Sequence, residues 1–380
     1  MHAPAALTAL RAILRTRFSE TALDDADLGE ASADELTAAA SRLGVVYPVC
    51  EALDAAKLAG VRVAELRESL KPYRLRALAL SVKLFEDGKI VVNALREGGV
   101  DHIPFKGPFL SLDLFGNPDA RTSSDIDIIL PGGRPDIDRA VAALEGVGYR
   151  RPEVSDVVAE YYARECREFT LHSGTRTPVD LHYGSYPDLP ESAFAAAAAR
   201  AVEVEHEGLR RRAFAGADLL AILSTHFWGV ARGMRLKWLL DIAALVARED
   251  TFAGDWLERV LQWRAQVLVA SAIEAARHDL GAAPPEAELR RLLGALTARE
   301  RTAARRVADV GCEGVRFGYV QRIHRLGLPV KARFRAVKKY LFPHPGRIAL
   351  DAGRPTWSPG LLDRAGHAVS RLVAALCAGS

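Results

Sequence analysis

The sequence predicts an α+β protein in which a core of mixed strands and helices lies between two helical regions. Apolar residues recur every three or four positions up to residue 98 and again after residue 215, as in amphipathic helices. Between these regions, short apolar segments bounded by Gly, Pro and Ser alternate with helical stretches, as is typical of strands in a mixed core. We therefore expect an N-terminal helical region at 1–98, a core at 99–215, a C-terminal helical domain at 216–345 and a tail with an amphipathic helix at 346–380.

Two signals mark helix boundaries in the N-terminal region. Ser32 and Glu35 have the spacing of a capping box, which predicts a helix start. Gly98 and Gly99 predict the end of the last helix of this region. The stretch "VDHIPF" that follows predicts a short strand.

The core begins with "DIDIIL", which predicts a strand, and continues with a helix that starts near Pro135. The segment "CREFTLHSGTRTPVDLHYG" predicts two strands around a Ser-Gly-Thr turn. A hairpin is expected in "AVEVEHEGLRRRAFAG", with Glu207 and Gly208 at its turn. The alanine run at 195–199 predicts a plain helix.

The segment from Asp218 to Glu249 is the strongest helical stretch of the C-terminal domain, and Pro284 and Pro285 predict a break after it. Lys237 and Asp241 have i, i+4 spacing, which predicts a surface salt bridge. We expect the aromatic and imidazole side chains of this segment to pack in the core, in preference to lining an acceptor pocket. These are His226, Trp228 and Trp238.

Composition narrows the class of protein. The 51 basic residues nearly balance the 48 acidic ones, so no concentrated basic surface for nucleic acid is indicated. The four cysteines are far apart and have neither zinc-site nor disulfide-scaffold spacing. The N-terminus lacks a signal-peptide pattern and no apolar run approaches the ~18 residues that span a bilayer. We expect a cytoplasmic protein without a membrane partner.

The two aspartates of "DID" are the strongest indication of chemistry. Side chains two apart on a strand point to the same face, so Asp125 and Asp127 form a pair of carboxylates while Ile126 and Ile128 pack on the other face. Two like charges held this close need a cation. Mg²⁺ or Mn²⁺ is expected, because such ions take hard oxygen ligands and usually only one or two protein carboxylates.

A third carboxylate lies in "RTPVDLHYG". Asp180 is placed on an apolar strand and faces the same way as His182. It is a candidate third metal ligand, and it is also a candidate base for the proton of an attacking hydroxyl group. We expect His182 to pack or to support a neighbouring ligand, and we place it outside the catalytic set.

A phosphate site is expected upstream of the acidic strand. "FKGP" follows a strand and precedes a short helix, so Gly107 allows close approach to the backbone and the helix start offers unpaired N–H groups. Lys106 adds a positive charge. Arg121 and Ser124 lie on the loop that enters the acidic strand and complete the expected phosphate contacts.

The order "KG…R…SDIDIIL…VDLH", with helices before it and "HFWGVARGMRLKWLLDIAAL" after it, resembles an uncharacterised bacterial nucleotidyltransferase family of the polymerase-beta-like superfamily. The resemblance covers most of residues 40–345. It implies the nucleotidyltransferase fold for the core, a triphosphate on the turn at Gly107 and a metal on Asp125 and Asp127, with Asp180 completing the site.

Two departures from the superfamily pattern stand out. Pro108 lies where the superfamily usually has Ser or Gly, and Lys106 is placed to compensate for the lost phosphate contact. The separation of Gly107 and Asp125, 125 − 107 = 18 residues, is longer than usual in the superfamily.

The leading hypothesis is therefore a Mg²⁺-dependent nucleotidyltransferase that moves NMP from an NTP to a hydroxyl or similar acceptor and releases pyrophosphate. The acceptor is a small molecule, a peptide natural product or a protein in preference to RNA. One alternative is a toxin-like enzyme that modifies RNA through the basic stretch from Arg316 to Lys339, although a solvated helix face is favoured there. The other is a catalytically silent nucleotide-binding protein, as Pro108 in the phosphate turn suggests.

Overall fold

The N-terminal region consists of helices. The computed structural model describes residues 4–19, 24–55, 60–184, 190–229, 236–308 and 344–354, with a few further positions between 356 and 370. The helices of this region are α1 (Pro4–Arg15), α2 (Ala33–Leu43), α3 (Val46–Ala55) and α4 (Val61–Glu97), with a 3-10 turn η1 (Asp25–Leu28) before α2.

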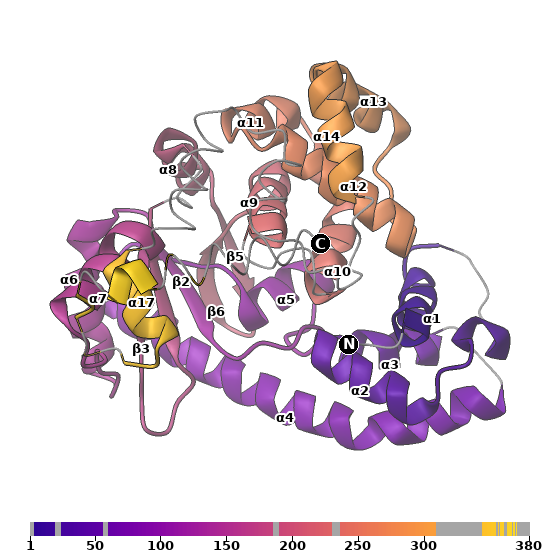
Figure 1. The fold of residues 1–380 in the computed structure, drawn as a ribbon, viewed down its shortest axis with the longest axis horizontal. Coiled ribbons are helices and arrows are strands. Elements are labelled where there is room, and N and C mark those ends of the chain that lie inside the picture. The colour runs from indigo at the N-terminus through magenta and orange to yellow at the C-terminus, as the bar shows by residue number, and fades with distance from the viewer. Residues whose placement is uncertain are drawn as a thin grey trace.

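The predicted helix boundaries of this region are confirmed. Ser32 Oγ accepts from the Glu35 amide at 3.2 Å, and the Glu35 carboxylate accepts from the Ser32 amide at 2.9 Å, which completes the capping box. Helix α4 ends at Glu97 with Gly98 as its C-cap. Its 37 residues run along the lower edge of the molecule, from the N-terminal helices to the sheet (Figure 1).

A four-stranded sheet forms the centre of the core. Its strands are β1 (Ile103–Pro104), β2 (Ile126–Leu130), β3 (Glu168–Leu171) and β4 (Val179–Tyr183). Their order across the sheet is β1-β2-β4-β3, with β2 and β4 parallel and the two outer pairs antiparallel. The strands predicted at "VDHIPF", at "DIDIIL" and on both sides of the Ser-Gly-Thr turn are all confirmed.

Short helices connect the strands of this sheet. They are α5 (Gly107–Phe115), α6 (Arg134–Glu145), α7 (Asp156–Tyr161) and a π-helical turn η2 (Tyr162–Cys166). Helix α6 carries Pro135 in its first turn, where a missing N–H costs no hydrogen bond, so the predicted helix start is confirmed.

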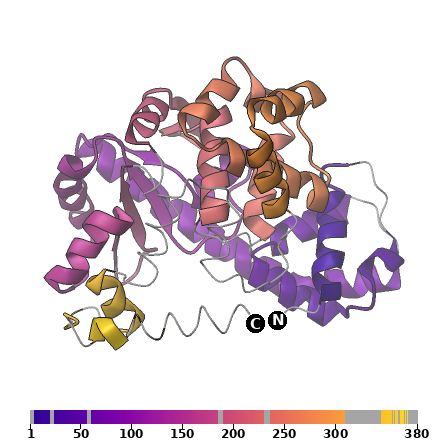
Figure 2. The ribbon, with the colours of Figure 1, turned by 45° about the horizontal axis from the view of Figure 1, so that its top comes forward.

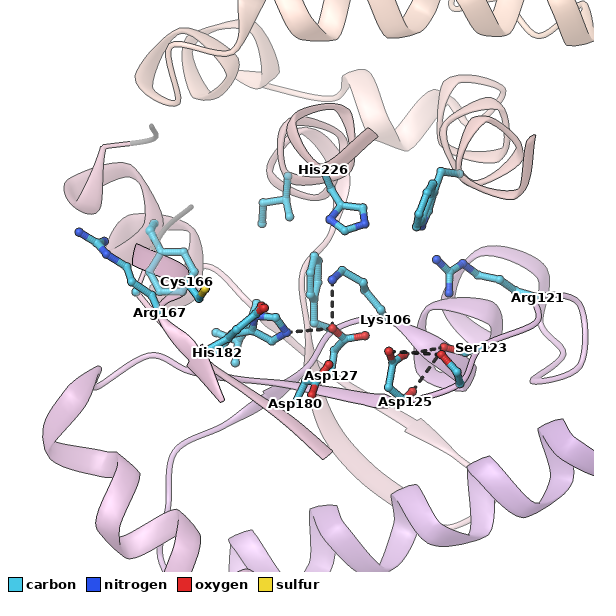
Figure 3. Close-up of a pocket in the computed structure, with 18 of the residues that line it drawn as sticks. Lys106, Arg121, Ser123, Asp125, Asp127, Cys166, Arg167, Asp180, His182 and His226 are labelled. Atoms are coloured by element: carbon cyan, nitrogen blue, oxygen red, sulfur yellow. Dashed lines mark hydrogen bonds and ion pairs between the residues drawn. The ribbon is translucent and has the colours of Figure 1, made fainter. Parts of the chain in front are cut away.

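The two faces of the sheet differ in polarity. Ile126, Ile128 and Leu181 belong to a buried apolar cluster that also contains residues of α4 and α6. Asp127 and Ile129 alternate with these isoleucines along β2 and therefore point to the other face, as predicted. The polar face looks toward the C-terminal helices (Figure 3).

A separate two-stranded hairpin follows helix α8 (Glu191–Ala199), which contains the alanine run. Strands β5 (Val202–His206) and β6 (Leu209–Ala213) are antiparallel. Glu207 and Gly208 between them have φ angles of 49° and 73°. Two central residues with positive φ suit the twist of a two-residue hairpin, so both the hairpin and its turn are confirmed.

The C-terminal region is helical, and the predicted proline pair lies in the segment that separates helices α12 and α13. Its elements are α9 (Gly216–Gly229), α10 (Leu236–Val246), η3 (Glu249–Phe252), α11 (Trp256–Gln262), α12 (Gln266–Leu280), α13 (Glu286–Ala295), α14 (Ala298–Ala308) and α17 (Pro345–Asp351). The predicted α+β class, a nucleotidyltransferase-like mixed sheet flanked by helical regions, is confirmed.

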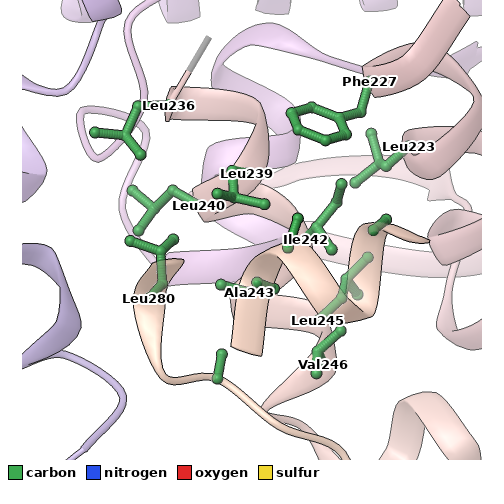
Figure 4. Close-up of a cluster of buried hydrophobic side chains, with 14 of the residues drawn as sticks. Leu223, Phe227, Leu236, Leu239, Leu240, Ile242, Ala243, Leu245, Val246 and Leu280 are labelled. Atoms are coloured by element: carbon green, nitrogen blue, oxygen red, sulfur yellow. The ribbon is translucent and has the colours of Figure 1, made fainter. Parts of the chain in front are cut away.

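One apolar core joins the two helical regions. Leu10 and Leu14 of α1 belong to the same buried cluster as Leu240 of α10 and Ile273 of α12. The α9–α10 part of this cluster, with Leu280 beside it, is shown in Figure 4. In Figures 1 and 2 the C-terminal helices from α9 to α14 lie above the N-terminal ones in both views.

Some expectations fall on residues that the structure does not describe. The whole basic stretch from Arg316 to Lys339 lies outside the described residues, and so does most of the tail after Asp351. Among the described residues, none of the helices combines the length and the apolar character that crossing a membrane requires.

Candidate active site

A cavity of about 490 Å³ lies between the polar face of the sheet and helices α9 and α10 (Figure 3). Six of the seven residues predicted for the site line it. They are Lys106, Arg121, Ser124, Asp125, Asp127 and Asp180. The strands and the loop before β2 thus bring together side chains that are up to 74 residues apart in the sequence, from Lys106 to Asp180.

The register of the parallel strands brings two of the carboxylates together. Asp127 of β2 is paired directly with Asp180 of β4, and Asp125, which directly precedes β2, lines the same cavity. Burial raises the pKa of Asp180, and the charges of Asp127 and Asp125 raise it further. A hydrogen bond from Thr170 at 2.6 Å lowers the pKa but does not outweigh these effects. A raised pKa strengthens Asp180 as a proton acceptor.

Asp127 carries two positive partners on a single oxygen. Its Oδ1 accepts from Lys106 Nζ at 3.0 Å and from His182 Nε2 at 2.8 Å. Burial alone would raise the pKa of Asp127, but the Lys106 ammonium and the His182 ring hold it well below its usual range. The carboxylate is therefore ionised, although Asp127 is only 5% exposed.

His182 is held from both sides. Its Nδ1 lies 3.1 Å from Glu168 Oε2, opposite the contact of Nε2 with Asp127. Burial lowers the pKa of His182, but hydrogen bonds to Asp127 and Glu168 outweigh it and raise the pKa to about 9. The ring is therefore an imidazolium at neutral pH, and Glu168, His182, Asp127 and Lys106 form a chain of alternating charges.

Glu168 is one of the cavity residues that the sequence patterns did not indicate. It lies opposite His182 in the antiparallel β3–β4 pair, and Thr170 lies opposite Asp180 two residues later. The alternation of Glu168 and Thr170 along "EFTL" is the signal that could have placed both on the polar face. The pairing with His182 was not visible, because the sequence does not state strand register.

Asp125 accepts hydrogen bonds from the loop that precedes it. Ser123 Oγ lies 3.1 Å from Asp125 Oδ1, and Ser124 Oγ lies 3.4 Å from Asp125 Oδ2. These hydroxyl groups orient the carboxylate at the edge of β2. Ser124 is exposed, so its hydroxyl group is accessible from the cavity.

Gly107 lies behind the cavity wall. It is buried and adopts a φ of 60°, and a Cβ there would lie 3.1 Å from the backbone oxygen of Asp125. A glycine is required for both reasons, because a side chain would be strained and would push against the acidic loop. Helix α5 begins at this residue, and Lys106 at its N-cap makes no side-chain capping bond, so the first amides of α5 are not capped by that side chain.

Arg121 is held by a buried ion pair. Its Nε donates to Asp241 Oδ2 of α10 at 2.8 Å, and the two side chains are 3% and 1% exposed. The prediction of a surface salt bridge between Lys237 and Asp241 is therefore wrong, because α10 turns Asp241 into the core. Lys237 Nζ instead donates to the backbone oxygen of Thr122 at 3.3 Å.

The wall opposite the sheet is aromatic. His226 of α9 and Trp238 of α10 meet edge to face, with ring centroids 5.1 Å apart. Trp238 packs against the apolar core and His226 is buried, but both also line the cavity, so the expectation that they pack in preference to lining a pocket is confirmed only in part. Burial and the nearby Lys106 charge lower the pKa of His226 well below its usual value, so its ring is neutral.

The carboxylates fit the chemistry of a divalent cation. The hydrogen bonds to Asp127 and Asp180 that the structure describes all fall on Oδ1, which leaves Oδ2 of each available to a hard ion. Among the described residues, no group of three or more His, Cys, Asp or Glu side chains is arranged to hold a metal by itself. Such a site suits an ion that brings further ligands with it, as Mg²⁺ does with phosphate oxygens and water.

Comparison with known proteins assigns the chain to a family. A family model described as "Uncharacterised nucleotidyltransferase" matches residues 29–303, most of the chain. The chain belongs to this family. The matched range contains every residue predicted for the site, and it confirms the resemblance drawn from the sequence motifs. No curated protein and no solved structure matches the chain.

The family assignment settles the broad class of function. The protein is a nucleotidyltransferase. Its general function is the transfer of NMP, and its substrate is a nucleoside triphosphate. The catalytically silent alternative is therefore set aside.

Proposed function

We propose that this nucleotidyltransferase binds a nucleoside triphosphate with Mg²⁺ or Mn²⁺ in the cavity above the sheet and transfers NMP to an acceptor hydroxyl group. The observation that carries the proposal is the convergence of Asp125, Asp127 and Asp180 on one wall of a single cavity. A module that only bound nucleotides would have little need for three buried or half-buried acids beside one another.

The triphosphate is assigned to the end of the cavity near Asp125. Arg121 lies at this end, Lys106 lies next to it above Asp127, and Ser124 adds a hydroxyl group (Figure 3). Lys237 of α10 lines the same cavity and is a fourth candidate. Helix α5 starts at Gly107 next to Lys106, and the positive end of its dipole favours negative charge there.

The metal is assigned to Asp125 and Asp127, and Asp180 of the neighbouring strand is assigned as a third ligand only once the ion has bound with its phosphate oxygens and water, since no three of these side chains are arranged to hold an ion by themselves. A bound Mg²⁺ would neutralise charge on the phosphate oxygens and orient the α-phosphorus. Lys106 and His182 keep Asp127 ionised through its Oδ1. Their contribution is to hold the carboxylate in one orientation before any substrate arrives.

The chemical step follows from these positions. The acceptor hydroxyl oxygen forms a bond to the α-phosphorus, the bond from this phosphorus to the bridging oxygen of the β-phosphate breaks, and pyrophosphate leaves. Asp180 takes the proton of the hydroxyl group, a role that its position in the cavity beside Asp127 supports. The acceptor class is a small molecule, a peptide natural product or a protein in preference to RNA.

The test combines binding and turnover. Calorimetric titration of Mn²⁺ and ATP into the wild type and into the Asp125→Asn/Asp127→Asn variant should show loss of metal-dependent nucleotide binding in the variant. Asp138→Asn is the matched control, because Asp138 lies on α6 and its side chain is 89% exposed. Labelled NTPs with Mn²⁺ and cell extract then report NMP transfer and pyrophosphate release. Equal binding by wild type and double variant would refute the assignment.

A further inference from the structure

The cavity has a second end, which the proposed function leaves unassigned. In Figure 3, Asp125 and Arg121 lie at one end, Cys166 and Arg167 lie at the other, and Asp127 lies between them. The strand order agrees with this view. Strand β4, which carries Asp180, lies between β2 and β3, and Arg167 directly precedes β3. Arg167 is thus on the far side of the proposed base from the metal pair.

Arg167 has an unusual backbone conformation that is held by hydrogen bonds to neighbouring residues. It follows the π-helical turn η2 and adopts a left-handed φ of 54°. Its amide donates to the oxygen of Tyr162 at 2.8 Å, and its own oxygen accepts from the amide of Tyr183 at 2.9 Å. π-Helical turns and left-handed non-glycine residues concentrate at functional sites.

The residue that follows β4 leaves space for the Arg167 guanidinium. Gly184 follows the strand with a φ of 89°, and a Cβ there would lie 3.3 Å from Arg167 Nη1. The same guanidinium forms an ion pair with Glu191 at the start of α8, a side chain that is 58% exposed. Glu191 thus contacts Arg167 from the solvent side, while Arg167 also lines the cavity.

A second arginine reaches this end from a distant part of the chain. Arg347 of α17 lines the cavity, and α17 packs against α7 (Figure 1). A hydrogen bond joins Arg347 to Tyr161 of α7. Arg167 and Arg347, from separate elements, therefore both line the cavity, and the contact of Arg347 with Tyr161 of α7 assigns it to the end that is opposite the proposed triphosphate site.

We propose that Arg167 and Arg347 bind an anionic group of the acceptor, so that the acceptor carries a carboxylate or a phosphate near the hydroxyl group that is attacked. Guanidinium groups are planar forks that match both anions. In-line attack requires the acceptor to approach from the side opposite the leaving pyrophosphate. This inference rests on the proposed function. The terminal phosphate of the nucleotide is the other anionic group whose chemistry matches Arg167 and Arg347.

The experiment measures anion binding and nucleotide binding separately on the full-length protein. Malonate and inorganic phosphate are the probe anions, titrated calorimetrically with and without Mn²⁺ and a non-hydrolysable ATP analogue. The variants are Arg167→Gln and Arg347→Gln. Arg164→Gln is the matched control, because Arg164 lies on the same π-helical turn, has a side chain that is 72% exposed and does not line the cavity. Thermal melting confirms that each variant is folded.

The expected result is a loss of anion affinity of about tenfold or more in Arg167→Gln and Arg347→Gln, since each removes a charge-assisted hydrogen bond. Arg164→Gln should match the wild type, anion binding should persist when the nucleotide is bound, and nucleotide affinity should change by less than about twofold in all three variants.

Two results would overturn the acceptor assignment. Competition between the probe anions and the nucleotide, with nucleotide affinity lost in both variants, would place the triphosphate at this end. Equal anion affinity in the wild type and both variants would show that the arginines bind no anion. Failure of the wild type to bind nucleotide would instead refute the proposed function, and the nucleotide-free titration would still decide whether this end holds an anion.

Discussion

At the scale of single residues, the two oxygens of Asp127 have different partners. Lys106 and His182 both contact Oδ1, and neither contacts Oδ2. Glu168 extends this arrangement by holding His182 from the other side. The described residues thus supply positive charge on the Oδ1 side of the carboxylate. This positive charge explains how a buried acid stays ionised beside Asp180.

Replacing Asp180 by asparagine separates its role from that of the metal pair. The substitution keeps the shape of the side chain and removes the proton acceptor, so we expect turnover to fall by ~10²–10⁴-fold. Nucleotide affinity should stay within about twofold of the wild type, because a base acts mainly after the substrate is bound. Steady-state rates and calorimetric nucleotide titration measure the two quantities.

Asp125→Asn serves as the comparison for Asp180→Asn and should lose both nucleotide affinity and turnover. Equal turnover in Asp180→Asn and the wild type would show that Asp180 has only a structural role.

At the scale of elements, the loop that enters β2 is anchored to helices on two sides. Arg121 is bound to Asp241 of α10, and Thr122 donates to the oxygen of Gly44 at 2.9 Å. Asn117 donates to the hydroxyl group of Tyr47 of α3 at 2.7 Å. The acidic loop is therefore held by both helical regions, which ties the geometry of the carboxylates to the packing of the helices.

The buried ion pair between Arg121 and Asp241 gives a stability prediction. Asp241→Asn removes one charge and leaves the Arg121 guanidinium buried without its counterion. We expect a loss of ~3–5 kcal/mol in the free energy of unfolding, because an uncompensated buried charge is costly. Urea denaturation measures the change. Asp250→Asn, at a side chain that is 65% exposed, is the control and should change the free energy of unfolding by less than ~1 kcal/mol.

Asp87 predicts a pH dependence of stability at the junction of α4 and the sheet. Its Oδ2 accepts from Lys83 Nζ at 2.5 Å and from both the amide and the hydroxyl group of Thr177 at 2.8 Å. Burial would raise the pKa of Asp87, but these partners lower it below the usual value. A lowered pKa in the folded state means that its contribution is present above the unfolded pKa, about 3.9, and is lost as the pH falls through the folded value.

Asp87→Asn should therefore cost ~1–3 kcal/mol of unfolding free energy at pH 7, since one amide replaces a carboxylate that accepts three hydrogen bonds. Urea denaturation should show this difference shrinking below about pH 4, as the wild-type carboxylate approaches its protonated form. A difference that grew on acidification would contradict the assignment.

At the scale of the whole molecule, the two helical regions share one apolar core although they are far apart in the sequence. Leu14 of α1 is fully buried in the same cluster as residues of α12. Arg11 of α1 forms an ion pair with Asp279 of α12 at 3.1 Å. The N-terminal helices are therefore part of the support for the helices that close the cavity.

Leu14→Ala tests this coupling. Removal of a fully buried leucine side chain should cost ~2–5 kcal/mol of unfolding free energy. Hydrogen exchange should accelerate in α12 as well as in α1, because the two helices pack in one core. Leu75→Ala is the control, since Leu75 is 67% exposed on α4 and its loss should leave the exchange unchanged. Faster exchange confined to α1 would show that the regions unfold independently.

Local patterns in the sequence were sufficient for much of the fold. The capping box at Ser32, the hairpin turn at Glu207 and Gly208, and the alternation of "DIDIIL" each involve residues close in the chain. Backbone propensity and side-chain periodicity decide such features, and these are properties of short segments. The alternation along "DIDIIL" was therefore enough to predict that Asp125 and Asp127 lie close together, and both line one cavity.

Other features of the site depended on the tertiary structure. The ion pair of Arg121 with Asp241 joins residues 120 apart, and spacing alone had favoured a surface partner for Asp241. The pairing of Glu168 with His182 depends on strand register, and the packing of Gly107 against the oxygen of Asp125 depends on how two loops meet. The sequence by itself was sufficient to predict most of the residues that line the candidate site. Only the tertiary structure decided their partners, because long-range pairing and burial are set by the packing of the whole chain.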